Sequence, residues 1–227
     1  MLSIVSLTWD QLHLTKKFIE SIRKNTDVPY ELIMVDNGSR DGTQEYIKQV
    51  ADKYHFFERN TGFSHGFNKG LSLASREYIA ICNNDTEFPP NWFRLLVQSF
   101  DSDPKCGLVF PCYTKGLKIA RRWRPGKKVI RLTPFEDSYP SGVAILSKLM
   151  ILRDKLGGFS EDYEIASGED ADLCFKVWTV GLDIYIDERV LVKHKGKSTV
   201  SKIPNWQKLF KRNAELFRQK WKDYIKD

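Results

Sequence analysis

The chain has 227 residues, of which 41% are hydrophobic and 29% charged, and its formal net charge at pH 7 is +7. This length suits one domain with a sizeable core, and the aromatic content of 13% argues against intrinsic disorder. A membrane-spanning helix needs about 18 uninterrupted apolar residues, whereas the best candidate, residues 143–152, is interrupted by Ser147 and Lys148. The N-terminus lacks the basic region of a secretory signal, so we expect a cytoplasmic protein.

The positive charge is concentrated in two segments. Residues 115–131 and residues 193–227 each carry a net charge of +8, and the rest of the chain carries −9. The sequence therefore describes an acidic body with two basic segments, and the partners of the basic segments are a separate question from the chemistry of the body.

The four cysteines are Cys82, Cys106, Cys112 and Cys174. They include no CxxC pair, and no histidine lies at zinc-ligand spacing from them. Cys82 and Cys174 lie inside apolar patterns, which predicts buried, inert thiols rather than disulfides or a zinc site.

The first third of the chain alternates predicted strands with predicted helices. The apolar pattern predicts strands at 2–7, 30–35, 54–58 and 78–82, and helices at 11–24, 42–52 and 66–75. Such alternation indicates βαβ units and a parallel sheet. Ligands bind such sheets at the carboxyl ends of the strands, where three polar clusters fall, at 36–42, 60–70 and 83–86.

The rest of the chain has a looser pattern. It predicts helices at 91–100 and 167–179, strands at 108–112 and 141–146, one or two strands within 184–192, and a loop or hairpin in the basic stretch. The C-terminal segment 201–227 predicts an amphipathic helix with a Lys/Arg-rich outer face. Its expected inward stripe is Trp206, Leu209, Phe210, Asn213, Leu216, Phe217, Trp221, Tyr224 and Ile225.

Asp36 begins the polar sequence DNGSRDGT between a predicted strand and a predicted helix. A carboxylate at this place can accept hydrogen bonds from a nucleobase or a ribose, and the glycines allow a close backbone approach. An ordinary strand-to-helix turn capped by Asp41 would explain the same residues without a ligand.

A second cluster, Asn83-Asn84-Asp85, follows the predicted strand 78–82. A carboxylate flanked by amides at a strand end suits one coordination position of a hard divalent ion, with diphosphate oxygens and water completing the shell. The alternative is the start of a loop before Pro89 and Pro90.

Three carboxylates, Glu169, Asp170 and Asp172, stand at the start of the predicted helix 167–179. The helix dipole stabilises acidic residues there, but capping does not require all of them. Glu169 or Asp170 is therefore a candidate general base, with Asp172 expected to cap the helix or face outward. His194, after the last predicted strand, suits either a structural role or a metal ligand.

The order of these clusters resembles the family 2 glycosyltransferases of GT-A fold, in their rhamnosyltransferase-like branch. The resemblance covers residues 2–196 and rests on the sequences SIVSLTW at 3–9, VDNGS at 35–39 with DGT at 41–43, NTGF at 60–63 with NKG at 68–70, NNDT at 83–86, GEDADL at 168–173, and His194. It implies an α/β Rossmann-like mixed sheet flanked by helices.

The resemblance also implies roles for individual residues. It assigns nucleotide-sugar binding to Thr8, Asp36, Asn60, Gly66, Asn83 and Asn84. It assigns Mn²⁺ or Mg²⁺ binding to Asp85 and His194, and general base catalysis to Asp170 with Glu169 beside it. Asn83 departs from the family's DxD motif, in which an aspartate stands first.

The implied reaction is an inverting transfer of a sugar from a nucleoside-diphosphate sugar to a hydroxyl of a glycan, polysaccharide or lipid-linked acceptor. A UDP-sugar is favoured, and dTDP-rhamnose stays open. The implied domain is 1–200, with a donor half at 1–112 and an acceptor and base half at 113–200, followed by the helix in 201–227.

Two other classes of protein compete with this interpretation. A metal-dependent sugar nucleotidyltransferase could share the sheet topology, but residues 6–9 lack the glycine- and arginine-containing phosphate loop of such enzymes. A nucleic-acid-binding protein would explain the basic segments, but would leave the carboxylates of Asp36, Asp85 and Asp170 unexplained. We therefore expect no nucleic-acid partner.

The basic segments have two interpretations each. Arg121, Arg122 and Arg124 lie where an acidic or phosphorylated acceptor would bind, or they belong to a solvated loop. The C-terminal helix packs on the domain through its apolar stripe, or it makes peripheral contact with anionic lipid.

Overall fold

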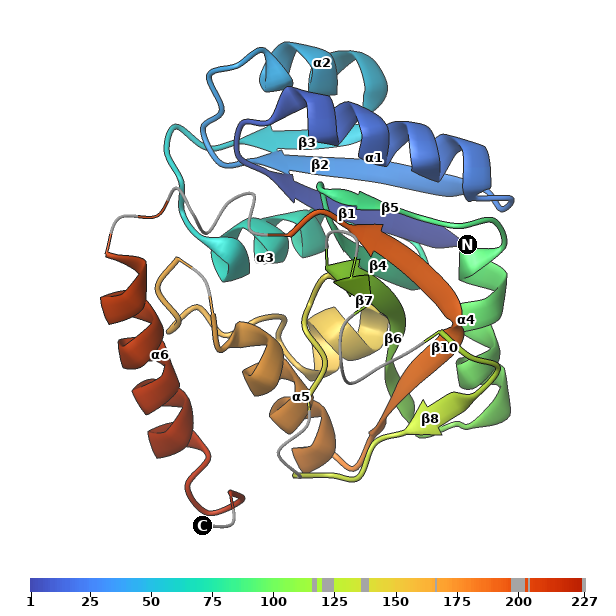
Figure 1. The fold of residues 1–227 in the computed structure, drawn as a ribbon, viewed down its shortest axis with the longest axis vertical. Helices are drawn as coiled ribbons and strands as arrows, with labels where there is room; N and C mark the ends of the chain where they lie inside the picture. The colour runs from blue at the N-terminus through green and yellow to red at the C-terminus, as the bar shows by residue number, and fades with distance from the viewer. Residues whose placement is uncertain are drawn as a thin grey trace.

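A single mixed sheet organises the chain, with helices on both of its faces (Figure 1). The computed structural model describes residues 1–115, 118–119, 125–135, 139–165, 167–196, 203 and 205–225. The ten strands of the sheet follow the order β3-β2-β1-β4-β9-β6-β10-β5, with β7 paired to β6 and β8 paired to β10.

The N-terminal half contains parallel βαβ units, as predicted. The elements are β1 (Leu2–Thr8), α1 (Leu12–Asn25), β2 (Tyr30–Asp36), α2 (Thr43–Val50), β3 (Lys53–Phe56), α3 (Phe63–Leu73) and β4 (Tyr78–Asn83). Strand β1 pairs in parallel with both β2 and β4, and β2 pairs in parallel with β3. Each predicted strand and helix of this half forms, with ends that move by a few residues.

The second half inserts an antiparallel strand into this arrangement. Its elements are β5 (Thr86–Glu87), α4 (Trp92–Ser102), β6 (Cys106–Lys115), β7 (Lys118–Ile119), β8 (Val129–Arg131), β9 (Ala144–Lys148), the π-helical turn η1 (Met150–Lys155), α5 (Glu169–Thr179), β10 (Asp183–His194) and α6 (Trp206–Lys220). Strand β9 pairs antiparallel with β4 and β6, while β10 pairs in parallel with β6. The expected hairpin in the basic stretch forms between β6 and β7.

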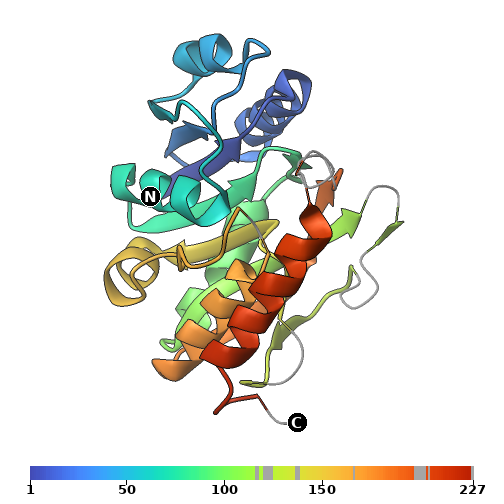
Figure 2. The same cartoon turned by 90° about the vertical axis from the view of Figure 1, so that its left-hand side faces the viewer.

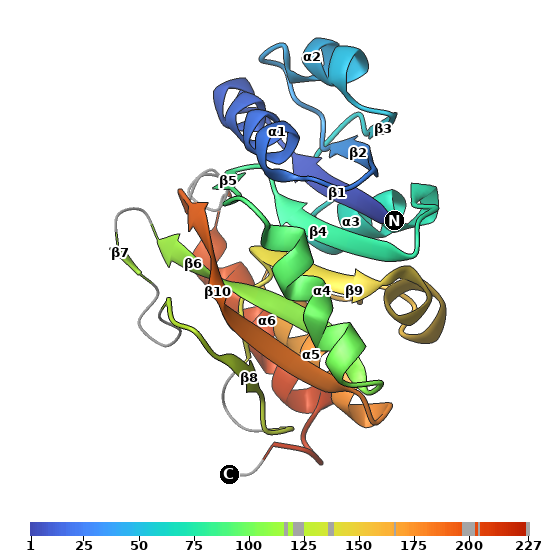
Figure 3. The same cartoon turned by 90° about the vertical axis from the view of Figure 1, so that its right-hand side faces the viewer.

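Alternating side chains divide the core between the two faces of the sheet. Ile4 and Met34 pack with α1, α2 and α4 on one face, and Val5 and Ile33 pack with α3, α5 and α6 on the other. Figure 3 shows α1 and α4 in front of the strands and α5 and α6 behind them. This three-layer arrangement leaves the strand ends free to form a site.

Helix α6 is anchored to the domain by the carboxylate of Asp172, which is fully buried. Asp172 accepts hydrogen bonds from Trp221 Nε1 at 2.9 Å, from the hydroxyl of Tyr163 at 3.1 Å and from Ser160, and its Oδ1 lies 2.8 Å from Lys220 Nζ. The expectation that Asp172 caps its helix or faces outward is wrong. Two of its partners, Lys220 and Trp221, lie on or next to α6, and Trp221 is 49 residues further along the chain.

The inward stripe expected for the C-terminal helix is only partly correct. Phe217 and Asn213 are buried on the domain, and α6 lies along α5 (Figure 2). Phe210 is 52% exposed, because its position on the helix lies beside a cavity rather than over the core. The division of the chain at residue 200 and peripheral contact with lipid stay predictions.

The cysteines are buried and free, as predicted. Burial raises the pKa of every one of these thiols above its ordinary value, which disfavours the reactive thiolate. Within the part of the chain that the structure describes, no helix has the length and apolarity to cross a bilayer.

The Asp172 anchor predicts a large loss of stability on substitution. We expect Asp172→Asn to lower the free energy of unfolding by about 2–4 kcal/mol, because Lys220 loses its buried partner and one amide cannot accept from all of the present donors. Urea unfolding measures this change. Asp154→Asn, which alters an exposed carboxylate paired with Arg153 on η1, should leave the urea midpoint unchanged; equal effects of both substitutions would contradict the anchor.

Candidate active site

The candidate site lies at one edge of the sheet, where the carboxyl ends of parallel strands meet. Thr8, Asp36, Asn83 and His194 end β1, β2, β4 and β10, which all run in the same direction. A cavity of about 290 Å³ opens at this edge. The predicted site residues that line it are Thr8, Asn60, Asn83, Asn84, Asp85, Glu169, Asp170 and His194.

Asp36 supports this cavity from behind and does not line it. Its fully buried carboxylate accepts hydrogen bonds from Thr8 Oγ1 at 2.8 Å, from Gln44 Nε2 at 2.7 Å and from the backbone and hydroxyl of Ser39. Asp36 thus positions Thr8, and its direct contact with a nucleotide stays a prediction. The next residue, Asn37, lines the cavity instead.

Gly66 also lies outside the cavity lining, within helix α3. A Cβ atom at this position would meet the side chain of Leu7, so Gly66 allows α3 to pack closely on β1. Asn60 lines the cavity, and its Oδ1 accepts a hydrogen bond of 2.9 Å from the backbone of Gly62. The loop at 60–62 is therefore ordered by Asn60 itself.

A short strand brings Asp85 next to His194. Strand β5 pairs antiparallel with the end of β10, with His194 opposite Thr86. The backbone of Gly196 donates to Asp85 Oδ2 at 3.2 Å, and His194 Nε2 lies 3.2 Å from Asp85 Oδ1. The two predicted metal ligands therefore come together, although they are separated by more than a hundred residues.

The Asp85–His194 pair suits a divalent cation that also binds phosphate. Nδ1 of His194 is buried and has no hydrogen-bond partner among the described residues. Those residues contain no group of three or more His, Cys, Asp or Glu side chains that could hold a metal. A carboxylate and an imidazole would fill part of the shell of Mg²⁺ or Mn²⁺, which ordinarily completes it with phosphate oxygens and water.

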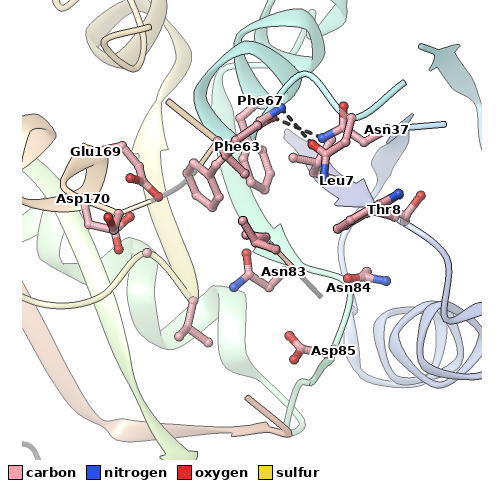
Figure 4. A pocket seen from close by; sticks show the side chains of 18 of the residues that line it. Leu7, Thr8, Asn37, Phe63, Phe67, Asn83, Asn84, Asp85, Glu169 and Asp170 are labelled. Atoms are coloured by element: carbon pink, nitrogen blue, oxygen red, sulfur yellow. Dashed lines mark hydrogen bonds between the residues drawn. The ribbon is translucent and has the colours of Figure 1, made fainter. Parts of the chain in front are cut away.

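Glu169 and Asp170 lie in the first turn of α5, which follows two residues with left-handed backbone, Ser167 at φ 82° and Gly168 at φ 96°. Figure 4 shows both carboxylates on the other side of the cavity from Thr8. Glu169 Oε2 and Asp170 Oδ1 have no hydrogen-bond partner among the described residues. Both residues line the cavity, and these two oxygens are buried in its wall.

The environment favours the protonated form of this carboxylate pair. Burial, together with the neighbouring charge of Asp170, raises the pKa of Glu169. Burial also raises the pKa of Asp170, against the opposing effect of hydrogen bonds from the backbone of Gly142 and the hydroxyl of Ser141. Because two adjacent buried carboxylates titrate as a unit, we expect Glu169 to hold a proton when Asp170 is ionised.

Gly142 leaves room for the carboxylate of Asp170, and no sequence pattern predicted this role. A Cβ atom on Gly142 would meet the carboxylate of Asp170, and Ser141 Oγ lies 3.5 Å from Asp170 Oδ2. The glycine precedes β9, so its approach to α5 depends on the tertiary fold.

The cavity has an apolar wall that the polar clusters did not predict. Phe63, Phe67, Ile165 and Trp206 contribute to it. Ile165 has a φ of 62°, which is unfavourable for a β-branched residue, and its carbonyl accepts a 2.6 Å hydrogen bond from the backbone of Phe63. Trp206 begins α6, so the C-terminal helix takes part in the site. Arg121, Arg122 and Arg124 lie outside the described residues.

The comparison with known sequences identifies the family. The sequence pattern of glycosyl transferase family 2 matches residues 3–157, and the chain belongs to this family. An uncharacterized glycosyltransferase of Rickettsia typhi is 25% identical over 206 residues, which cover 86% of this chain and 64% of that protein. The chain thus spans less than two thirds of the length of this relative.

Solved structures show the same fold. S. aureus TarS (residues 1–349) in complex with UDP-GlcNAc matches all of this chain and 68% of its own, with a TM-score of 0.74 and 16% identity. A mannosyltransferase from Pyrobaculum calidifontis in complex with GDP-Man and Mn²⁺ matches 99% of this chain and 65% of its own, with a TM-score of 0.72 and 18% identity. The predicted GT-A fold is confirmed, while the rhamnosyltransferase-like branch stays a prediction.

The carboxylate pair predicts an unusual pH dependence of stability. The folded state raises the pKa of Glu169, so it holds a proton that the unfolded state releases, and this residue lowers stability as the pH rises above the ordinary carboxyl range. We expect Glu169→Gln to increase the free energy of unfolding by more than about 1 kcal/mol near pH 8 and by much less near pH 5. Urea unfolding at both pH values is the test, and an increase of equal size at both would contradict the assigned ionisation.

Proposed function

We propose that the chain transfers a sugar from a nucleoside-diphosphate sugar to an acceptor hydroxyl, with inversion at the anomeric carbon. The observation that carries the proposal is a cavity with Asp85 and His194 on one side and the buried carboxylates of Glu169 and Asp170 on another. Membership of glycosyl transferase family 2 supports sugar transfer over the nucleotidyltransferase alternative.

The donor would occupy the strand ends. Thr8, Asn60, Asn83 and Asn84 offer hydroxyl and amide groups for a base and ribose. Asn84 is held by a 3.0 Å hydrogen bond from its Nδ2 to Thr15 Oγ1, so its remaining oxygen keeps a fixed direction. The complex of TarS with UDP-GlcNAc favours a uridine nucleotide, and a dTDP-sugar such as dTDP-rhamnose stays the alternative.

The diphosphate would lie beside Asp85 and His194. These residues would hold Mn²⁺ or Mg²⁺, and such a cation, when bound, neutralises charge that develops on the leaving diphosphate. The Mn²⁺ in the mannosyltransferase structure supports this choice of metal. The short β5–β10 pairing keeps Asp85 and His194 together before the donor arrives.

Asp170 would act as the general base. The acceptor hydroxyl loses its proton to a carboxylate oxygen of Asp170 while the acceptor oxygen bonds to the anomeric carbon. The bond from that carbon to the diphosphate breaks on the opposite face, and the electron pair leaves with the nucleoside diphosphate. Glu169, when protonated, allows Asp170 to remain ionised, and burial raises the pKa of Asp170 toward a value suited to a base.

The acceptor would be a glycan, a polysaccharide or a lipid-linked molecule. A second cavity, lined by residues of α5 and α6, shares Asp170 with the first, which supports an acceptor on that side. Peripheral contact of the protein with a membrane surface is compatible with such an acceptor and belongs to this proposal.

The assignment of the base predicts a selective loss of transfer. We expect Asp170→Asn to lower the transfer rate by about 10²–10⁴-fold, because the acceptor loses its proton acceptor, while the affinity for the donor changes little. Release of nucleoside diphosphate and binding of nucleotide sugar are the two measurements. Asp101→Asn, an exposed change on α4, is the control, and near-normal transfer by Asp170→Asn would exclude this residue as the base.

The metal site predicts a ligand effect that requires both cation and nucleotide. In a thermal-shift panel of nucleotide sugars, we expect UDP-sugars or dTDP-sugars to raise the melting temperature with Mn²⁺ and to raise it much less without it. Asp85→Asn and His194→Gln should each abolish the Mn²⁺-dependent part of the shift. His13→Gln, on α1, is the matched control, and a Mn²⁺ effect that survives both site substitutions would contradict the assignment.

A further inference from the structure

A second cavity, of about 440 Å³, adjoins the candidate donor site at Asp170. It shares Ser141, Ser167 and Asp170 with the first cavity and is otherwise lined by residues of α5 and α6 and by Phe135, Tyr139, Pro140 and Ile225. Figure 2 shows α6 lying along α5, the two helices that line this cavity. A molecule in the second cavity would therefore lie beside Asp170 without entering the donor cavity.

The walls of this cavity contain many aromatic side chains. The larger apolar side chains that line it are Phe135, Tyr139, Phe175, Phe210, Phe217 and Ile225. Two of them are left open to solvent, since Phe210 is 52% exposed and Tyr139 is 44% exposed. A gathering of exposed aromatic side chains around a hollow is typical of a ligand site.

The cavity has few polar groups, and the hydroxyls and the carboxylate come from other segments than the cationic group. Ser141, Ser167 and Asp170 lie where it meets the donor site, and Arg218 of α6 is the cationic residue among its described lining. A free oligosaccharide would set many hydroxyl groups against hydrocarbon, and each unpaired hydroxyl would cost free energy. An apolar group fits the walls better, and the guanidinium of Arg218 complements an anion.

We propose that this cavity binds the acceptor, and that the acceptor is an amphipathic anion. An apolar chain beside the reacting hydroxyl would lie among the aromatic residues, with an anionic group such as a phosphate at Arg218 and the hydroxyl at Asp170. This assignment rests on the proposed sugar transfer and deepens it, because it names the chemical class of the acceptor.

Binding of geranyl phosphate, a small amphipathic anion, tests the proposal without requiring catalysis. Isothermal titration calorimetry on the full chain should detect it, with geraniol and inorganic phosphate each binding at least about tenfold more weakly. Arg218→Gln should lower the affinity for geranyl phosphate to that for geraniol, because the charge-assisted contact is lost. Equal affinities for geranyl phosphate and inorganic phosphate would overturn the proposal. So would binding of the protein to vesicles of anionic lipid without any affinity for geranyl phosphate.

Variants of α6 separate this cavity from the rest of the helix surface. Phe210→Glu places a negative charge at the cavity, and Ala214→Trp fills it. Each substitution should therefore lower the affinity for geranyl phosphate by at least about tenfold. Gln219→Glu and Gln219→Trp make the same chemical changes at an exposed position that does not line the cavity, and should not alter binding. Equal effects at positions 210 and 219 would overturn the assignment.

A separate readout distinguishes failure of this inference from failure of the proposed function. Phe210→Glu should keep the Mn²⁺-dependent thermal shift with a nucleotide sugar and keep slow hydrolysis of that donor by water. If wild-type protein shows the donor shift but no affinity for geranyl phosphate, the acceptor class is wrong and the sugar transfer stands. If the donor shift is absent, the proposed function itself fails.

Discussion

The common direction of β1, β4 and β10 is the constraint on which the rest of the structure depends. Because these strands end at the same edge of the sheet, Thr8, Asn83 and His194 meet there from three distant parts of the sequence. The antiparallel strand β9 lies between β4 and β6, yet preserves the shared direction of the strands on either side. The site is thus a product of topology more than of any single motif.

The buried carboxylate of Asp172 has the corresponding role on the other side of the cavity. It joins α5, which carries Asp170, to α6, which carries Trp206 at the donor cavity and Arg218 at the second one. Two acidic residues of the same helix turn therefore have different roles. Asp170 lines the cavity, and Asp172 holds α6, which forms part of the cavity wall. The difference follows from their directions around the helix.

Sequence reasoning succeeded where local pattern decides the structure. Apolar spacing is sufficient for helix α1, whose Leu14, Phe18 and Ile22 are all buried, and for the parallel strands of the first half. It failed for the two-residue strand β5, for Gly142 and for Asp172, whose roles depend on partners far along the chain. The sequence also did not show that the carboxylate of Asp36 holds Thr8, or that Gly66 leaves room for Leu7, because both contacts arise from tertiary packing.

A crystal structure of the chain with UDP and Mn²⁺ tests the central claim most directly, since it locates the nucleotide and the metal together. We expect the diphosphate and Mn²⁺ at Asp85 and His194, the uridine toward Thr8 and Asn60, and an unobstructed face toward Asp170. A nucleotide bound outside this cavity, or Mn²⁺ held by residues other than Asp85 and His194, would contradict the account.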